Sequence, residues 1–162
     1  MAPRAASLSL VVALGSLIAA SASQARVKDI RIDTTEPFAE GQSFGEAGPY
    51  LRIKGVAKGE LDPKAPELAD IVDLDKAPVN SRGLVEYEVD FFVLRPVTPS
   101  RGILFYEVLN RGNKQIGQRL HDVAGGGAAA LNDPRTRADA GNAFLFERGY
   151  SIVWSGWEAD VA

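Results

Sequence analysis

The chain has 162 residues, of which 46% are apolar or aromatic and 24% are charged, and its formal charge is -3. These values are typical of a globular domain and exclude a disordered chain, a collagen and a coiled coil. The 18 basic and 21 acidic residues give no electrostatic footprint for nucleic acid or for an anionic membrane. The absence of cysteine and the single histidine, His121, exclude disulfides, thiol catalysis, cysteine-ligated zinc and any site with two imidazoles. We expect no metal and no cofactor.

Residues 1–25 have the organisation of a secretory signal peptide. One basic residue, Arg4, precedes an apolar run over residues 8–20, and small residues follow it. The run is shorter than the roughly 20 residues that span a bilayer. We expect cleavage after Ala25, or else after Ala22, a secreted or periplasmic location and no membrane attachment afterwards. The alternative is a buried N-terminal helix or an uncleaved anchor.

The first two thirds of the remaining chain have the pattern of short strands. Residues 27–33 alternate between apolar and polar side chains. Residues 36–49 are rich in glycine and proline and predict turns and loop. Residues 50–56 and 68–74 predict two further strands, because the glycines and prolines between them prevent a helix.

Residues 84–94 form the clearest strand pattern of the chain and follow a predicted turn at residues 80–83. The side chains expected to face the core are Val85, Tyr87, Val89, Phe91 and Val93. The acidic residues Glu86, Glu88 and Asp90 alternate with them and are expected to face water or a polar cover. This pattern is typical of an antiparallel strand near a sheet edge.

After residue 96 the pattern becomes that of a parallel sheet. Residues 103–109 are almost continuously apolar, which predicts a strand covered on both faces. Residues 139–148 carry a helix signature with Asp139 as the N-cap, and residues 150–154 form a second apolar strand. Strand, helix and strand in this order predict a right-handed crossover and a parallel pair.

The expected fold class is therefore α/β, with N-terminal antiparallel strands that lead into the first β-α-β unit of a parallel sheet. A parallel sheet needs helices on both faces, and the sequence predicts only one such helix with its caps. Half of the expected sheet is missing, so that further sequence or a partner must supply it. The alternative is a self-contained antiparallel β domain with a C-terminal ββ unit.

Short motifs in a fixed order run through residues 48–157. They are Gly48-Pro49-Tyr50, Lys54-Gly55, Gly59-Glu60-Leu61-Asp62-Pro63, Ile71-Val72-Asp73-Leu74-Asp75, Tyr106-Glu107-Val108, Asn110-Arg111-Gly112-Asn113-Lys114, Asn132-Asp133-Pro134, Ala140-Gly141-Asn142, Phe144-Leu145, Gly149-Tyr150 and Trp154-Ser155-Gly156-Trp157. Together they resemble the start of a family of secreted bacterial proteins described only as α/β-hydrolase domain-containing proteins, whose full members are considerably longer. The resemblance implies that residues 26–162 are an incomplete N-terminal portion of an α/β-hydrolase-like domain.

The resemblance also implies that the complete protein is an ester or related acyl hydrolase with a small-molecule ester as its substrate. Such chemistry needs a serine on a strand-to-helix elbow, an acid, a histidine and backbone N–H groups that hold the oxyanion. In this interpretation the nucleophile, the acid and the histidine lie beyond residue 162, and the chain alone is catalytically silent. The alternative is a secreted, non-catalytic binding or accessory domain that is rich in β-strands.

Ser43 lies in a G-x-S-x-G match over residues 41–45. The elbow of a hydrolase requires a buried strand before the serine and a helix directly behind it. Residues 37–40 and 46–49 offer neither, and we interpret the match as a chance one in a glycine-rich loop. A small self-contained hydrolase that uses Ser43 and His121 is a third hypothesis.

Asn110, Arg111 and Gly112 are better candidates for a functional site. They follow the apolar strand at 103–109, where hydrolases of this fold place a loop that donates an oxyanion N–H. Gly112 allows close approach of the backbone to a substrate. Arg111 can bind a carboxylate or a phosphate, or it can pair with a nearby aspartate. The alternative is a plain turn with polar caps.

The remaining polar patterns point to no metal or nucleotide. The aspartates at 70, 73 and 75 lie within a predicted strand and lack the glycine spacing of an EF-hand. The glycines at 125–127 lack the Gly-Lys-Ser/Thr ending of a phosphate-binding loop. His121 is interpreted as a lone surface histidine in a polar linker, with a catalytic role beside Asp122 as the alternative. Trp154 is expected in the core, and for Trp157 a core and a pocket position are both open.

Overall fold

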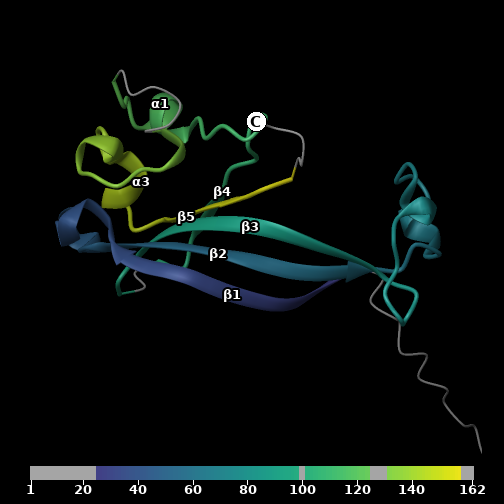
Figure 1. Ribbon diagram of the computed structural model, residues 1–162. Coiled ribbons are helices and arrows are strands. Elements are labelled where there is room, and N and C mark those ends of the chain that lie inside the picture. Colours follow the sequence, from purple (N-terminus) through teal and green to yellow (C-terminus); the bar gives the residue numbers. More distant parts are fainter. Residues whose placement is uncertain (1–24, 99–100, 125–130, 158–162) are drawn as a thin grey trace, which may run out of the picture.

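The computed structural model describes residues 25–98, 101–124 and 131–157. The predicted signal peptide, apart from Ala25, and the glycines at 125–127 lie outside the described residues. The strands are β1 (Ala25–Pro37), β2 (Tyr50–Leu61), β3 (Val85–Pro96), β4 (Leu104–Tyr106) and β5 (Ser151–Ser155). They form one mixed sheet in the order β1-β2-β3-β5-β4, in which β4 and β5 are parallel and the other neighbours are antiparallel (Figure 1).

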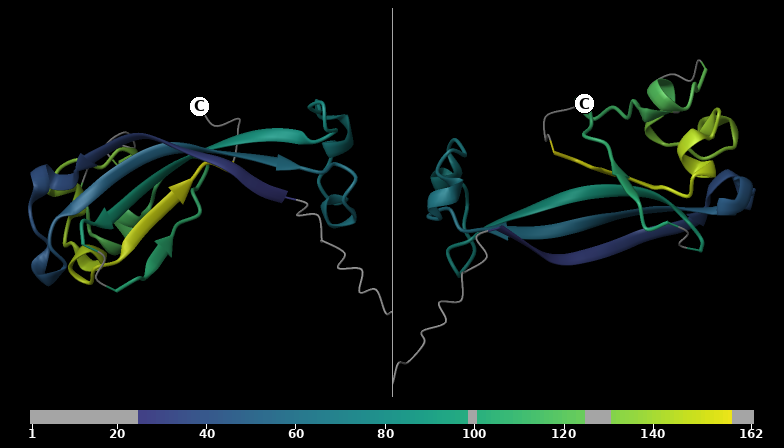
Figure 2. Two further views of the ribbon diagram at one scale, coloured as in Figure 1. Left: turned by 90° about the horizontal axis from the view of Figure 1, so that it is seen from below. Right: turned by 180° about the vertical axis from the view of Figure 1, so that it is seen from behind.

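Helices are few and short. The α-helices are α1 (Ile116–Leu120) and α3 (Phe144–Glu147), and the 3-10 turns are η1 (Phe38–Gly41), η2 (Gly45–Ala47), η3 (Pro66–Leu68), η4 (Leu74–Lys76) and η5 (Ala138–Ala140). Both α-helices lie on the same side of the sheet, over one end of β2 and β3, whereas η3 and η4 lie at the opposite end (Figures 1 and 2). None of the described helices is long and apolar enough to cross a membrane. The fold is a strand-rich mixed sheet.

The three long strands confirm the predictions at residues 27–33, 50–56 and 84–94, and all three extend further than predicted. β2 continues through Gly55 and Gly59 because aromatic rings of β3 occupy the space that a side chain would fill at these two positions. Gly55 pairs with Phe91 and Gly59 with Tyr87 in the register of the sheet. A Cβ atom at position 59 would come within 2.1 Å of the Tyr87 ring. Cross-strand pairing of this kind stabilises a strand that contains glycine.

The prediction of a strand at residues 68–74 was wrong. The segment forms 3-10 turns instead, and Asp73 has a left-handed backbone with a φ of 60° that interrupts any extended chain. Ile71 and Val72 are 47% and 87% exposed, since no neighbouring strand pairs with the segment among the described residues. The aspartates at 70, 73 and 75 therefore lie in exposed turns and not on a strand.

The alternation predicted for β3 is confirmed, but its core face was assigned wrongly over the second half. Phe92 and Leu94 are buried, with 6% and 1% exposure, whereas Phe91 and Val93 are only half-buried. The reason is that α1 and α3 cover the face that carries Phe92 and Leu94. β3 is also the central strand of the sheet, and the prediction of a position near an edge was wrong.

The strand predicted at 103–109 is much shorter than expected and lies at the edge of the sheet. β4 has three residues, and Leu104 and Tyr106 are 59% and 47% exposed. The prediction of a strand covered on both faces was therefore wrong. Its parallel pairing with β5 is confirmed, with Leu104 opposite Ser151 and Tyr106 opposite Val153. The strand predicted at residues 150–154 is confirmed as β5.

The helix predicted at 139–148 is divided in two. Gly141 and Ala143 have φ angles of 51° and 59°, which separate η5 from α3. Asp139 does not cap α3, because its Oδ2 atom accepts the backbone N–H groups of Arg135 and Thr136. The sequence pattern also missed α1, which lies in the segment that was interpreted as a polar connection.

The core is concentrated beneath the helices and is strongly aromatic. The Phe146 ring stacks on Phe38 and Phe44, with centroid distances of 5.2 and 4.8 Å. The Tyr50 hydroxyl donates to the Phe146 carbonyl at 2.9 Å and joins β2 to α3. Trp154 is 2% exposed, which confirms its predicted place in the core.

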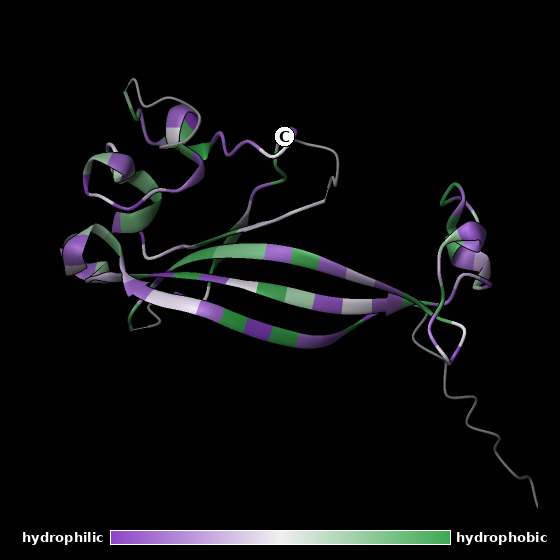
Figure 3. Cartoon of the chain, viewed as in Figure 1, coloured by the Kyte–Doolittle hydropathy of each residue, from purple (hydrophilic) through white to green (hydrophobic). Residues whose placement is uncertain are grey.

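The opposite face of the sheet carries no helix among the described elements (Figure 1). Polar and apolar residues alternate along much of the long strands (Figure 3), and the register shows which of the apolar ones share this face. The register aligns Ile32 with Gly55 and Phe91, and Ile30 with Ala57 and Val89. Ile30 and Ile32 are 62% and 57% exposed. We call this surface the uncovered face; its apolar side chains include Ile30, Ile32, Ile53, Val89, Phe91, Val93, Leu104, Tyr106 and Val153.

Candidate functional site

Residues 110–113 form a tight turn directly after the segment that contains β4. The Asn113 N–H donates to the Asn110 carbonyl at 3.0 Å, and the Asn110 N–H donates back to the Asn113 carbonyl at 3.1 Å. Arg111 and Gly112 have φ angles of 48° and 77°, so both central residues are left-handed. Two left-handed central residues between a doubly bonded pair define a type I′ turn. We call these residues the 110–113 turn.

Asn132 fixes the far side of the 110–113 turn. Its Oδ1 atom accepts the Lys114 N–H at 2.8 Å, and its Nδ2 group donates to Asn113 Oδ1 at 3.1 Å. The Lys114 ammonium donates to the Asn132 carbonyl. Three hydrogen bonds from a single residue therefore hold the exit of the turn in place. The sequence signal for this contact is the Asn132-Asp133-Pro134 motif. Its role as a support of the turn was not predicted.

Glu107 fixes the near side of the turn from within the sheet. One carboxylate oxygen accepts the Gln115 N–H at 2.9 Å, at the start of α1, and the other accepts the indole N–H of Trp154 on β5. The indole N–H of Trp157 donates to the Leu109 carbonyl at 2.8 Å. The chain segments that leave β4 and β5 are thus joined. Trp157 itself is 58% exposed and is not a core residue.

The tip of the 110–113 turn presents donors that have no acceptor within the described part of the chain. The backbone N–H groups of Arg111 and Gly112 make no hydrogen bond there, and the exposed Arg111 guanidinium has no ion pair. Arg111 therefore does not pair with any described aspartate. Backbone N–H groups and a guanidinium are the donors that bind oxyanions and carboxylates.

A cationic cluster lies behind the turn. The Lys114 ammonium is 4.0 Å from the centre of the Phe92 ring and 5.1 Å from that of Trp154. Burial and the charge of Lys54 lower the pKa of Lys114 to about 8. Attraction of the cation to the two ring faces holds it in place although no carboxylate pairs with it in the residues described.

Asp133 is the anion at the centre of this cluster. It bonds Arg52, Lys54 at 2.6 Å and Arg135 at 2.7 Å. Burial acts to raise the pKa of Asp133, but the hydrogen bonds from Lys54, Arg52 and Arg135 outweigh it and hold the pKa well below its usual range. Arg52 is 2% exposed and also pairs with Glu36 at 2.7 Å. These ion pairs join β1 and β2 to the segment that supports the turn.

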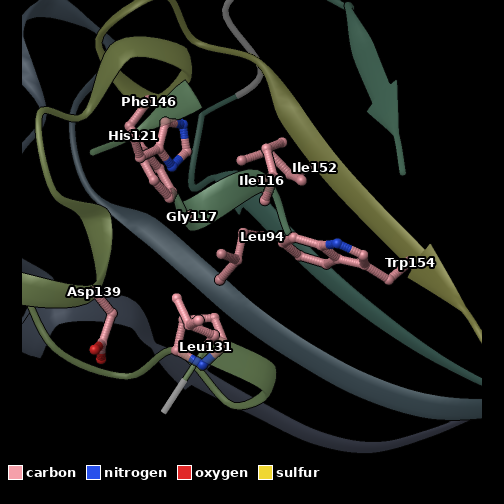
Figure 4. Close-up of a pocket in the computed structure, with 10 residues that line it drawn as sticks. Leu94, Ile116, Gly117, His121, Leu131, Asp139, Phe146, Ile152 and Trp154 are labelled. Atoms are coloured by element: carbon pink, nitrogen blue, oxygen red, sulfur yellow. The ribbon is translucent and has the colours of Figure 1, made fainter. Parts of the chain in front are cut away.

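His121 is buried, so the expectation of a surface position was wrong. It is 2% exposed, its ring centre lies 5.0 Å from that of Phe146, and its Nε2 atom has no hydrogen-bond partner in the described part of the chain. It lines a cavity of about 20 Å³ together with Leu94, Ile116, Gly117, Leu131, Pro134, Asp139, Phe146, Ile152 and Trp154 (Figure 4). Burial lowers the pKa of His121 to about 4, against the opposing charge of Asp122.

The His121 cavity does not contain the partners that a catalytic histidine needs. Its volume is sufficient for a single water molecule. No serine is among its described lining residues, and Asp139 is engaged by the backbone N–H groups of Arg135 and Thr136. The arrangement places a neutral imidazole in a mainly apolar pocket.

Ser43 lies on the surface between two 3-10 turns, η1 and η2. It bridges to Pro49, and the next residue, Phe44, is buried in the aromatic core. Neither a buried strand before Ser43 nor an α-helix behind it occurs in the described segments 25–42 and 44–61. A strand-to-helix elbow is therefore not formed around this serine.

Among residues 25–98, 101–124 and 131–157, no group of three histidine, aspartate or glutamate side chains is placed to hold a metal ion. A comparison of the chain with family models, with curated proteins and with solved structures finds no match. The position and the free donors of the 110–113 turn thus provide the strongest indication of function.

Proposed function

We propose that this chain is the N-terminal part of a secreted α/β-hydrolase-like protein of the ester or acyl hydrolase class. The observation that carries the proposal is the position of the 110–113 turn, which follows β4 beyond the carboxyl end of the parallel β4–β5 pair. Ligands of open sheets with parallel strands bind outside the carboxyl ends of those strands. The turn brings to that edge two backbone N–H groups that no described residue engages.

In this proposal the N–H groups of Arg111 and Gly112 stabilise the negative charge that develops on the carbonyl oxygen of an ester. Donors that are already fixed in place cost no reorganisation when the charge appears. Asn132 and Glu107 supply that rigidity through their hydrogen bonds on the two sides of the turn. The nucleophile, the acid and the histidine come from sequence beyond residue 162.

The uncovered face supports the same proposal. A sheet that leaves one face in water normally carries polar side chains on that face. Here α1 and α3 cover one face, whereas Ile30 and Ile32 on the other are more than half exposed. Further helices of a larger domain are the natural cover for such a surface.

The first test reads the gene downstream of the codon for Ala162. An open frame that continues into a G-x-S-x-G sequence between a buried strand and a helix supports the proposal. A stop codon at that position overturns it and favours a second candidate function, a secreted binding or accessory domain. The observation that favours this second candidate is the same uncovered face, which then serves to bind a partner.

The second test measures hydrolysis of p-nitrophenyl acetate by the purified chain and by the Ser43→Ala variant. Because Ser43 lies outside any elbow and His121 faces a cavity without serine, we expect no hydrolysis above the rate in buffer for either protein. Hydrolysis by the unmodified chain that disappears in Ser43→Ala contradicts the proposal and establishes a self-contained hydrolase.

A further inference from the structure

The Arg111 guanidinium points to the chemical class of the substrate. We propose that it binds a free carboxylate of the substrate, so that the site takes esters that carry a second, ionised carboxyl group. This inference rests on the proposed function, in which the N–H groups of the same turn face the reacting carbonyl. The guanidinium and the N–H groups then bind two different oxygen-bearing groups of a single molecule.

The first reason is that no carboxylate of the described residues neutralises Arg111. Both oxygens of Glu107 accept hydrogen bonds from Gln115 and Trp154. The carboxylate of Asp133 is shared among three other cations. Within the described residues the planar guanidinium is thus left with all its donors, in the fork that matches a carboxylate.

The second reason is the residue type at this position of the turn. Both central positions of a type I′ turn require a left-handed backbone, and asparagine, aspartate or glycine are preferred there. Arg111 adopts this backbone with a φ of 48° although its side chain makes no described contact that would hold it there. An arginine at this position is therefore explained by what its side chain binds rather than by the turn.

The third reason is the single charge of the turn, which favours a carboxylate over a phosphate. Lys114 is the next cation along the chain, but its ammonium faces the Phe92 ring and the Asn132 carbonyl. The tip therefore offers one positive charge, which matches one carboxylate. A phosphate dianion would call for a second cation. Trp157, exposed and fixed to the Leu109 carbonyl, adds an apolar surface for the carbon chain of the ligand.

The test is an NMR titration of the isotope-labelled chain with monomethyl succinate, an ester with a free carboxylate, and with the neutral dimethyl succinate. We expect saturable shifts of the Arg111 Nε–H and Trp157 indole signals with monomethyl succinate only.

Arg111→Asn keeps a residue that type I′ turns prefer, and we expect it to bind at least about tenfold more weakly. Arg119→Asn is the matched control, because Arg119 is an exposed arginine on α1 without an ion pair in the described structure. It is expected to bind as the unmodified chain does.

Equal binding by Arg111→Asn and the unmodified chain overturns the inference, as does equal binding of the two esters. Tighter binding of inorganic phosphate than of monomethyl succinate overturns the assignment to a carboxylate and makes the turn a phosphate site. The outcome is separable from that of the proposed function. Ser43-dependent hydrolysis contradicts the proposed function whatever the titration shows, whereas a failed titration with a silent chain contradicts this inference alone.

Discussion

His121 is the residue whose environment departs furthest from its sequence context. A histidine in a polar linker is expected at the surface, yet its ring lies against Phe146, and Nε2 has no hydrogen-bond partner among the described residues. The aromatic side chain of Phe146 comes from a segment 25 positions later in the sequence, and no local pattern indicates that the two meet. A buried imidazole is neutral because protonation would place an unpaired charge in an apolar pocket.

This burial makes the stability of the protein depend on pH. The pKa of His121 is about 4 in the folded chain and has its ordinary value of 6.5 when unfolded, so the unfolded state binds more protons between these values. Stability is fully present above pH 6.5 and is lost as the pH falls toward 4, by about 3 kcal/mol in total. Urea unfolding at pH 7, 6, 5 and 4.5 measures the loss.

The control for this prediction is His121→Phe, which keeps a ring against Phe146 and removes the titration. Between pH 6.5 and 4.5 we expect its stability to change much less than that of the unmodified chain. The carboxylates with lowered pKa, Asp133, Glu60 and Glu86, begin to weaken the fold slightly above their ordinary values of 3.8 and 4.5. They therefore act at the acid end of this window, and equally in His121→Phe, so that the difference between the two proteins reports His121. A variant as pH-dependent as the parent chain rules out His121 as the cause.

At the scale of elements, the sequence predicted strands well where a strand has its own alternation. β3 is the clearest example, because its acidic and apolar residues separate onto two faces whatever its neighbours are. The prediction at 68–74 failed for the opposite reason: its apolar residues suit a strand, but none of the described strands lies beside it. Strand pairing is a tertiary property, and a short apolar run carries no information about it.

The candidate site was predictable in part. The loop after the apolar run at 103–109 was identified, and its Arg-Gly pair marks the turn that the structure contains. The residues that hold the turn, Glu107 and Asn132, were not identified, because their contacts join segments far apart in the sequence. The core face of β3 was assigned wrongly since the position of α1 and α3 decides it.

Gly55 tests how closely β1, β2 and β3 are packed. A Cβ atom at this position would lie 2.1 Å from the Arg31 backbone carbonyl and 2.5 Å from the Phe91 ring. The backbone of β1 cannot move aside without breaking its pairing with β2, so we expect Gly55→Ala to lower the free energy of unfolding by about 2 to 3 kcal/mol. The midpoint and slope of urea unfolding provide the measurement.

Gly59→Ala is the matched substitution in the same strand. The three atoms nearest to its Cβ all belong to the side chain of the half-buried Tyr87, which can rotate away toward solvent. We expect a loss of about 1 kcal/mol or less. Equal losses for the two alanine variants would mean that the Arg31 carbonyl does not restrict position 55, and the register of β1 on β2 near its irregularity at 32–34 would need revision.

At the scale of the whole molecule, the two faces of the sheet differ in what covers them. Ile152 on β5 is fully buried beneath the helices, whereas Ile32 on β1 is 57% exposed on the uncovered face. The same change, isoleucine to threonine, keeps the β-branched shape and replaces a methyl-bearing arm with a hydroxyl. The change in stability that this substitution causes therefore reports how each face is packed.

We expect Ile152→Thr to lower the free energy of unfolding by about 2 to 4 kcal/mol, because it removes buried apolar volume and buries a hydroxyl. Ile32→Thr is expected to change it by less than about 0.5 kcal/mol, and to reduce the binding of the dye ANS and the aggregation of the chain. Urea unfolding and ANS fluorescence measure the two effects. A loss at Ile32 as large as at Ile152 would mean that the uncovered face is packed in the purified chain, which removes that support for a larger hydrolase domain.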